Sequence, residues 1–189
     1  LTGAGILGAA SAGTQTITNN NTLAIADGTG SASNYTLNGA SINVTVIPKT
    51  LNVTLAREYD GTTTVAGALL TPTFDSLQGG ETLAISGTGS VANANVGSSK
   101  AVTLGTIALA AGSGNPSNYS LNSVLLDVTQ RVINLDGIRA YDATTNVLSS
   151  DINTFGNIVS GETLTISGTG SVATLSLIHI SEPTRPTPI

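Results

Sequence analysis

Three segments of the sequence occur twice, at nearly the same spacing. One pair, residues 80–92 and residues 161–173, is identical at twelve of its thirteen positions. A fixed period constrains the architecture more than any local pattern does, and a period of about 82 residues is the size of an independent domain rather than of one solenoid rung. The sequence therefore predicts tandem modules of about 82 residues. The repeated segments are residues 80–92 with 161–173 (offset 81), 57–65 with 139–147 (offset 82), and 33–38 with 117–122 (offset 84).

These offsets divide most of the chain into three segments. Residues 1–47 correspond to the C-terminal half of a repeat, residues 48–130 to a complete repeat, and residues 131–174 to the N-terminal half of a further repeat. The junctions Pro48-Lys49 and Gln130-Arg131 occupy equivalent positions in this division. Because the first and third segments are cut within a module, we expect the chain to be an internal piece of a longer protein.

Residues 175–189 follow none of these patterns. They read Leu-Ser-Leu-Ile-His-Ile-Ser-Glu-Pro-Thr-Arg and then Pro-Thr-Pro-Ile, where the complete repeat has Asn-Val-Gly. The segment resembles translated sequencing-adapter DNA, so we interpret it as an artefact of sequence assembly. The alternative is a genuine proline-rich terminus. The segment contains His179, the one histidine of the sequence.

The composition leaves little room for catalytic chemistry. Charged residues make up 9% of the chain, which has no cysteine, methionine or tryptophan and a single histidine. These counts exclude disulfide frameworks, thiol nucleophiles and cysteine- or histidine-rich zinc sites. Serine or threonine hydroxyls without a neighbouring base are poor nucleophiles. We therefore expect no enzyme, no catalytic residue, no cofactor and no metal site.

Charge and hydropathy also bear on the expected partners. The net charge is −5 with only six lysines and arginines, whereas binding of nucleic acid requires clustered cations that displace condensed counterions. No apolar run approaches the roughly 18 residues that a membrane span requires. We expect neither a nucleic-acid partner nor a membrane span.

Short alternating segments separated by turn residues predict strands. Polar and apolar residues alternate over residues 51–55, 82–86 and 119–121, which is the period of a half-buried strand. Clusters of glycine, asparagine and aspartate recur between them at intervals of roughly ten residues, a spacing typical of a sandwich. We predict an all-β fold, with an immunoglobulin-like sandwich as the preferred module and a β-grasp-like module as the alternative.

The most distinctive polar motif is Tyr59-Asp60-Gly61, which recurs as Tyr141-Asp142 followed by alanine. One interpretation of the motif is a ligand contact. We favour a structural role, in which the ring lies over the edge of the core. The carboxylate then accepts hydrogen bonds from a following threonine or backbone amide in an Asx-type turn.

Two details follow from the same comparison of copies. Ala143 stands where the first copy has Gly61, and a left-handed backbone at alanine costs about 1 kcal/mol or more. We therefore expect an ordinary backbone conformation at both positions. Tyr35 and Tyr119 occur in the repeated Asn-Tyr segment, and we assign both of them the same structural role at the edge of the core.

The order of the motifs carries a family resemblance. Tyr-Asp-Gly-Thr-Thr is followed by Gly-Glu-Thr-Leu, Asn-Val-Gly-Ser-Ser-Lys-Ala-Val-Thr and Asn-Tyr-Ser-Leu, with a Thr-Gln-Arg or Ile-Pro-Lys junction. Over roughly residues 1–173 this order resembles the YDG-type repeat of filamentous-haemagglutinin-like exoproteins, the two-partner-secretion adhesins of Gram-negative bacteria. The resemblance implies module arrays on an extracellular or surface-attached protein, and it implies no catalytic or binding residues. Ala143 departs from the family motif.

Two functions remain open at this point. The first is a structural stalk or spacer within a large bacterial adhesin. Its partners are the neighbouring repeats of the same chain, while other regions of the parent protein bind a host-surface glycan or protein. The second is a module that itself binds a carbohydrate or a host receptor. An exposed aromatic platform on the complete repeat would favour the second function, and the whole chain offers four tyrosines and two phenylalanines.

Overall fold

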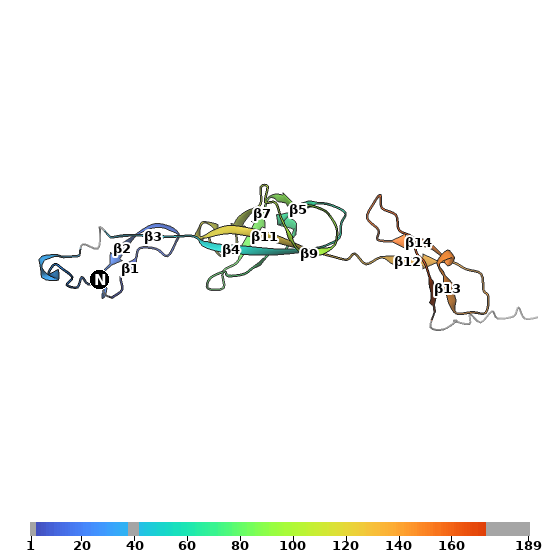
Figure 1. Ribbon diagram of the computed structural model, residues 1–189, viewed down its shortest axis with the longest axis horizontal. Helices are drawn as coiled ribbons and strands as arrows, with labels where there is room; N and C mark the ends of the chain where they lie inside the picture. The colour runs from blue at the N-terminus through green and yellow to red at the C-terminus, as the bar shows by residue number, and fades with distance from the viewer. Residues whose placement is uncertain (1–2, 38–41, 173–189) are drawn as a thin grey trace, which may run out of the picture. The chain divides into compact units, whose positions relative to one another are not determined.

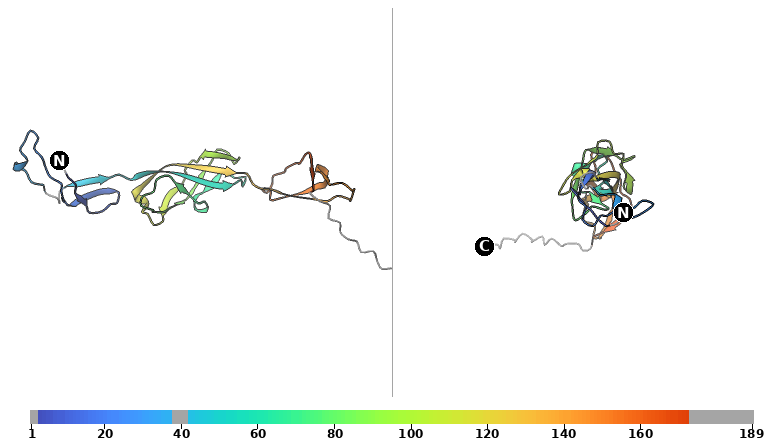
Figure 2. Two further views of the ribbon diagram at one scale, coloured as in Figure 1. Left: turned by 90° about the horizontal axis from the view of Figure 1, so that it is seen from below. Right: turned by 90° about the vertical axis from the view of Figure 1, so that its left-hand side faces the viewer.

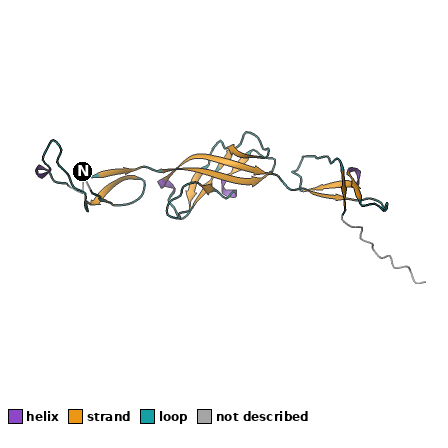
Figure 3. Cartoon of the chain, turned by 60° about the horizontal axis from the view of Figure 1, so that its bottom comes forward, coloured by secondary structure: helices purple, strands orange, loops and turns teal. Residues whose placement is uncertain are grey.

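The computed structural model describes residues 3–37 and 42–172. The chain divides into two compact units, one ending at Gln130 and the other beginning at Arg131. Strands make up most of the regular structure, and the helices are short 3-10 turns (Figure 3). The predicted all-β class is confirmed. Residues 175–189, interpreted above as an artefact, lie outside the described residues.

A four-stranded sheet runs through the complete repeat. β4 and β11, the first and last of these strands along the chain, are parallel neighbours at its centre (Figure 1). β6 pairs antiparallel with β4, and β9 pairs antiparallel with β11. The order across the sheet is β6 (Thr73–Phe74), β4 (Lys49–Glu58), β11 (Tyr119–Thr129) and β9 (Gly97–Ala101).

This central parallel pair differs from the preferred immunoglobulin-like arrangement, in which both sheets are antiparallel. Alternation along a strand shows that one face is buried, but it does not distinguish a parallel partner from an antiparallel one. A parallel pair requires a crossover of a dozen residues or more. Residues 59–118 provide that crossover here, and they are themselves largely strands and turns.

Two strand pairs from the crossover pack against the sheet (Figure 2). β5 (Thr64–Ala66) pairs with β8 (Thr88–Ser90), and β7 (Leu83–Ser86) pairs with β10 (Ala108–Ala111), both antiparallel. Gly87 lies between β7 and β8 with a φ of 79°, and a Cβ atom there would lie 2.1 Å from the carbonyl oxygen of Thr106. The Gly-Thr-Gly segment is therefore a tight bend, so that one continuous stretch of chain forms β7, which pairs with β10, and then β8, which pairs with β5.

The core lies between the sheet and these strand pairs. Every second residue of β4 points inward, which is the alternation expected of a strand with one buried face. Burying these aliphatic side chains stabilises the module by about 1.5 to 3 kcal/mol for each fully buried side chain. The main buried cluster consists of Val53, Leu55, Val65, Ile85, Val91, Ile107, Val124, Leu126 and Val128.

A β-bulge changes the phase of β11. Leu121 pairs with Leu51 and Ser123 pairs with Asn52, so Asn122 is an extra residue in the backbone register between the two strands. A bulge of one residue reverses which side chains of a strand face the core. It therefore places both Tyr119 and Val124 inward, although their positions differ by five and a regular strand would put them on opposite faces.

The residues before the complete repeat form a small sheet of β1 (Ile6–Leu7), β2 (Gly13–Asn19) and β3 (Asn43–Val46), in that order. The helix η1 (Ala32–Asn34) precedes Tyr35, and η4 (Pro116–Asn118) precedes Tyr119. These two short helices differ by the same offset of 84 residues as the sequence segments that contain them.

The second unit reproduces strand pairings of the complete repeat. β12 (Asn134–Gly137) pairs with β14 (Ile152–Gly156), and Leu135 faces Phe155 as Val53 faces Phe74. In the same way, the antiparallel pair of β13 (Asn146–Leu148) and β15 (Thr169–Ser171) is the counterpart of the pair of β5 and β8. The helices η3 (Gly67–Leu69) and η5 (Ser149–Asp151) correspond at an offset of 82.

The second unit also contains an open apolar hollow. Its volume is about 350 Å³, and Leu135, Val147 and Ile166 are among the residues that line it. Leu135 is 41% exposed, whereas Val53, its counterpart in the complete repeat, is 1% exposed. The described part of this unit contains no counterpart of β11, and the apolar face of β11 covers this position in the complete repeat.

Candidate functional site

The Tyr-Asp-Gly motif of the complete repeat forms a tight turn directly after β4. The Oδ1 atom of Asp60 accepts hydrogen bonds from the backbone N–H of Thr62, at 2.9 Å, and from the hydroxyl of Thr62, at 3.0 Å. This is the geometry of an Asx turn, in which an aspartate side chain bonds the backbone two residues further on. Asp60 thus forms the Asx turn that the sequence predicted for it.

An arginine closes the turn from the other side. The Nη1 atom of Arg57 lies 3.0 Å from Oδ2 of Asp60 and donates to the carbonyl oxygen of Thr64 at 2.6 Å. Its Nη2 atom donates to the carbonyl oxygen of Thr62. The planar guanidinium suits this use because it presents several donors in a fixed arrangement. We refer to Arg57, Asp60, Thr62 and Thr64 as the arginine clasp.

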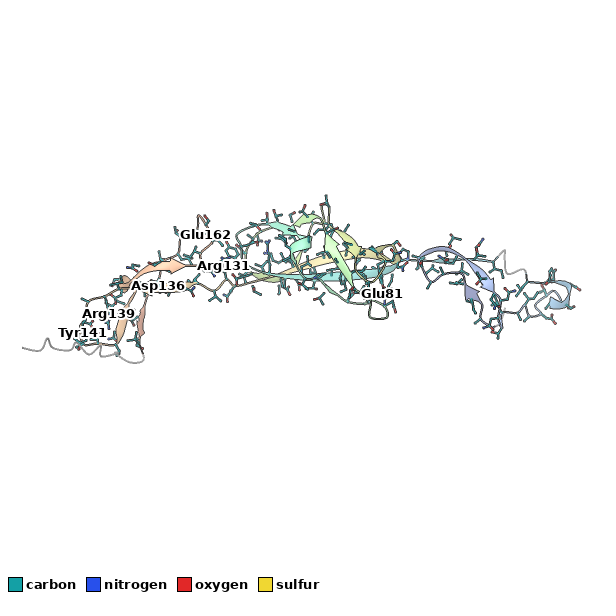
Figure 4. The ribbon with its side chains drawn as sticks, turned by 180° about the vertical axis from the view of Figure 1, so that it is seen from behind. Glu81, Arg131, Asp136, Arg139, Tyr141 and Glu162 are labelled. Carbon is teal, nitrogen blue, oxygen red and sulfur yellow. The ribbon has the colours of Figure 1, made fainter. Side chains whose placement is uncertain are left out.

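The second copy of the motif repeats the ion pair, the Asx bonds and the arginine bond to the first threonine carbonyl. Arg139 Nη1 lies 3.0 Å from Asp142 Oδ2, and Asp142 Oδ1 accepts from the N–H and the hydroxyl of Thr144, each at 2.9 Å. Arg139 also donates from Nη2 to the carbonyl oxygen of Thr144 at 2.5 Å. Arg139 and Tyr141 are labelled in Figure 4. The clasp is therefore a property of the motif and recurs with it.

The role of the arginine was missed in the sequence analysis, although a signal for it exists. An arginine stands three residues before the aspartate in both copies. Its side chain is 9% exposed at Arg57 and 21% exposed at Arg139. Arginine is rarely this buried without a partner, so its recurrence beside an aspartate would have indicated the ion pair.

The clasp keeps both carboxyl groups ionised. Burial raises the pKa of Asp60, but the hydrogen bonds from Thr62 and the charge of Arg57 outweigh this effect and hold the pKa below its usual value. Hydrogen bonds from Thr144 have the largest effect on Asp142 and lower its pKa, and Arg139 lowers it further. Hydrogen bonding and an opposite charge both favour the carboxylate over the acid.

The expected ordinary backbone inside the turn is wrong. Gly61 has a φ of 76° and Ala143 has a φ of 61°, so both residues are left-handed. The Asx bond and the arginine ion pair of each copy together hold the chain on both sides of this residue and so determine its conformation. At Gly61 this conformation carries little cost, whereas at Ala143 the side chain makes it unfavourable by about 1 to 2 kcal/mol.

The two motif tyrosines differ in their surroundings. Tyr59 packs against the main core cluster, as predicted, and its backbone N–H donates to the carbonyl oxygen of Thr129 at 2.9 Å. Tyr141 is 83% exposed, so its predicted position over the core edge is wrong. In the complete repeat β11 supplies Val124, Leu126 and Val128 to the cluster against which Tyr59 packs. The described residues of the second unit include no equivalent strand.

Tyr35 and Tyr119 also differ. Tyr119 is 7% exposed and packs with Leu51 and Leu83. Its hydroxyl donates to Glu81, which Figure 4 labels, and this hydrogen bond is the main cause of the raised pKa of Tyr119. Tyr35 is 70% exposed, so its assigned place at the core edge is wrong. The partners of Tyr119 come from the first half of a repeat, which residues 1–47 do not contain.

The two Nη atoms of Arg57 and the carboxylate of Asp60 are thus bonded to each other and to nearby backbone and threonine groups. Across the described ranges, no three aspartate, glutamate or histidine side chains gather closely enough to hold a metal ion. No helix in the described part of the chain has the length and apolar character needed to cross a membrane. The arrangement fixes the shape of a turn at the end of β4 and holds that turn against the core.

The fold and the clasp together define a class, an all-β module whose first strand ends in an arginine-closed Asx turn. Residues 47–125 match the family model of the YDG domain, so a YDG domain is found in this part of the chain. The matched segment includes β4, the clasp and the first part of β11. No curated protein and no solved structure matches the chain.

Proposed function

We propose that the complete repeat is a spacer module of a large secreted or surface-attached adhesin, of the filamentous-haemagglutinin-like kind found in Gram-negative bacteria. The observation that carries this proposal is the parallel pairing of β4 and β11. Because the strands are parallel, the chain enters the module at the start of β4 and leaves it at the end of β11, at opposite ends of one sheet. Such a module lengthens a chain each time it is repeated.

The contacts of the motif side chains support the same function. Asp60 and Arg57 are engaged in the clasp and stabilise a turn. Of the two tyrosines in this repeat, Tyr59 packs against the core and Tyr119 is buried. These groups build the module, and in this proposal the host-surface ligand is bound by other regions of the parent protein.

The second candidate function is binding of a carbohydrate or host receptor by the module itself. It is favoured by Tyr35 and Tyr141, which are 70% and 83% exposed. An exposed aromatic ring offers a flat apolar face to a sugar or a protein surface. Both rings lie outside the complete repeat. The equivalent tyrosines inside the complete repeat are packed against its core, so we place the spacer function first.

A distance measurement on the full chain tests the spacer function. The sequence has no cysteine, so Ile47→Cys with Gln130→Cys gives two unique positions for spin labels. Twelve strand residues at about 3.3 Å each predict one narrow distance distribution near roughly 40 Å. A broad distribution, or a much shorter distance, would contradict a spacer that holds its two ends apart.

A binding screen distinguishes the two functions. The full chain is applied to glycan arrays and host extracellular-matrix proteins, and the spacer proposal expects no saturable binding. Saturable binding that Tyr35→Ala or Tyr141→Ala abolishes, without a change in melting temperature, would instead establish the receptor-binding function. Tyr35→Phe and Tyr141→Phe are the matched controls because they keep the ring.

We also propose that residues 175–189 derive from sequencing-adapter DNA. The proposal rests on the resemblance of this segment to a translated adapter and on its departure from the repeat after Thr174. Genomic DNA read independently beyond the codon for Thr174 tests it. A continuation like Asn-Val-Gly-Ser-Ser-Lys is expected, whereas a continuation through His179 would contradict the proposal.

A further inference from the structure

The β4–β11 pair extends along the whole module. All ten residues of β4, from Lys49 to Glu58, have partners on β11, from Tyr119 to Thr129. The backbone bond from Tyr59 N–H to the carbonyl oxygen of Thr129 continues the ladder by one residue beyond β4. The strand through which the chain enters the module is therefore bonded along its length to the strand through which the chain leaves.

This geometry determines how tension would act on the module. A force applied along the chain pulls on β4 at Lys49 and on β11 at Thr129, which lie at opposite ends of the parallel ladder. The two strands are then pulled past each other, so the ladder bonds share the load and must break nearly together. If the force separated two ends on the same side of the ladder, the bonds would break one after another under a smaller load.

We propose that the β4–β11 ladder is a mechanical clamp, which gives the module resistance to stretching as well as length. The proposal rests on the spacer function for its biological purpose, since a spacer on a surface adhesin carries the load when the adhesin is pulled. The clamp itself is a property of residues 49–129 and is tested without any ligand.

The position of the ladder in the sheet favours this role. β6 lies on the outer side of β4 and β9 lies on the outer side of β11, so each clamp strand also has a second neighbour. Beneath them, Val53, Leu55 and Leu126 are nearly completely buried in the main core. Sliding one strand past the other therefore requires disruption of the core as well as of the ladder.

Side chains also tie the two strands together. The Oδ1 atom of Asn52 accepts from the amide of Asn122 at 2.9 Å and from the hydroxyl of Ser123 at 2.8 Å. Its own amide donates to Asp75 Oδ2 at 2.8 Å, next to β6. Asn52 therefore connects three neighbouring segments at the level of the bulge, where the backbone ladder has an unpaired residue.

Single-molecule stretching of the full chain in two directions tests the clamp. Ile47→Cys with Gln130→Cys applies the force along the ladder, and Ile47→Cys with Ser117→Cys applies it at one end. Ile47 is 80% exposed, and Ser117 and Gln130 are exposed as well, so the attachment points disturb little. Circular dichroism of both variants checks that the fold is retained.

The expected result is an unfolding force about two-fold or more higher along the ladder than at one end, because forced unfolding depends on the barrier in the direction of pulling. Equal forces in the two directions would overturn the clamp. The spacer function would still stand in that case, because the label distance and the binding screen test it separately.

A pair of point variants tests the same ladder in a second, independent way. Asn52→Ala removes the tie between the clamp strands, whereas Asn93→Ala removes a bond from Lys100 Nζ, at 2.7 Å, that lies outside the ladder. Both asparagines are exposed. In the Ile47–Gln130 direction, Asn52→Ala is expected to lower the unfolding force and Asn93→Ala to leave it unchanged. An equal effect of both variants, or no effect of Asn52→Ala, would contradict the clamp.

Discussion

Arg57 and Asp60 form an ion pair across the turn that follows the first long strand of the complete repeat, with 3.0 Å between Nη1 and Oδ2. Arg139 and Asp142 repeat this pair at the same distance in the second unit. One local arrangement thus occurs twice in a single chain, once beside a closed core and once beside an open one. Substitutions at equivalent positions therefore serve as controls for each other.

The first prediction concerns the clasp. Asp60→Ala removes the acceptor of the Asx turn and leaves Arg57 without its carboxylate, so we expect the free energy of unfolding to fall by about 1 kcal/mol. Urea titration followed by the NMR signals of the Thr62 and Thr144 amides measures the two units separately. Asp142→Ala should leave the Thr62 transition unchanged. A Thr62 transition that Asp60→Ala does not shift would show that the clasp adds no stability.

The second prediction concerns the left-handed residue in the turn. Gly61→Ala introduces a side chain at a φ of 76° and should destabilise the complete repeat by about 1 kcal/mol. Ala143→Gly relieves the same strain and should stabilise the second unit by about 0.5 to 1 kcal/mol. The same urea titrations measure both changes. Changes of the same sign in the two variants would contradict the explanation from backbone strain.

The third prediction is a dependence of stability on pH. Asp60, Asp75 and Asp142 have pKa values below the usual value for aspartate. The folded state therefore binds protons less readily than the unfolded state does. The stabilisation is fully present above the unfolded pKa of about 3.9 and is lost as the pH falls through the lower folded pKa values.

Thermal melts between neutral pH and about pH 2 measure this loss. Asp60→Asn and Asp75→Asn should each make the acid branch of the curve less steep. Added salt should weaken the part that comes from the exposed ion pairs. A melting temperature that rises on acidification would have the wrong sign and would contradict the assignment.

The fourth prediction compares the two motif tyrosines. Tyr59→Ala removes a ring that packs against the main core and should cost about 2 kcal/mol of stability. Tyr141→Ala removes a ring that is 83% exposed, and the effect should stay within about 0.5 kcal/mol. Differential scanning calorimetry of the full chain measures both. Similar losses for the two variants would show that Tyr141 is packed in solution.

The fifth prediction compares the tyrosines of the repeated Asn-Tyr segments. Tyr119→Phe removes the hydroxyl that donates to Glu81 and accepts from the N–H of Gln78, so the complete repeat should melt a few degrees lower. Tyr35→Phe changes an exposed ring and should leave the melting temperature unchanged. An unchanged melting temperature for Tyr119→Phe would show that this hydroxyl contributes nothing to stability.

Much of the local structure was predictable from the sequence. The alternation over residues 51–55 indicated a strand with one buried face, and Leu51, Val53 and Leu55 are buried. The aspartate of the motif indicated an Asx turn, and Asp60 bonds Thr62 in that way. These predictions succeed because side-chain alternation and side-chain-to-backbone bonding depend on residues that are close in the chain.

The backbone inside the turn was predicted wrongly although it is local. The presence of Ala143 at the position of Gly61 argued for an ordinary conformation, because only the unfavourable energy of a left-handed alanine was considered and not the bonds around it. The clasp supplies several hydrogen bonds and an ion pair that offset this energy. A strained residue persists when the surrounding bonds determine its conformation.

The sequence by itself determined the all-β class, the repeated motifs and the Asx turn, because each depends on patterns within a few residues. Only the tertiary structure decided that β4 pairs in parallel with β11, since Val53 and Val124 are partners across a separation that no local pattern encodes. It also decided that Tyr119 is buried while Tyr35 is exposed. Nearly identical local sequences have different surroundings when the segments that would cover them are present beside one copy and not beside the other.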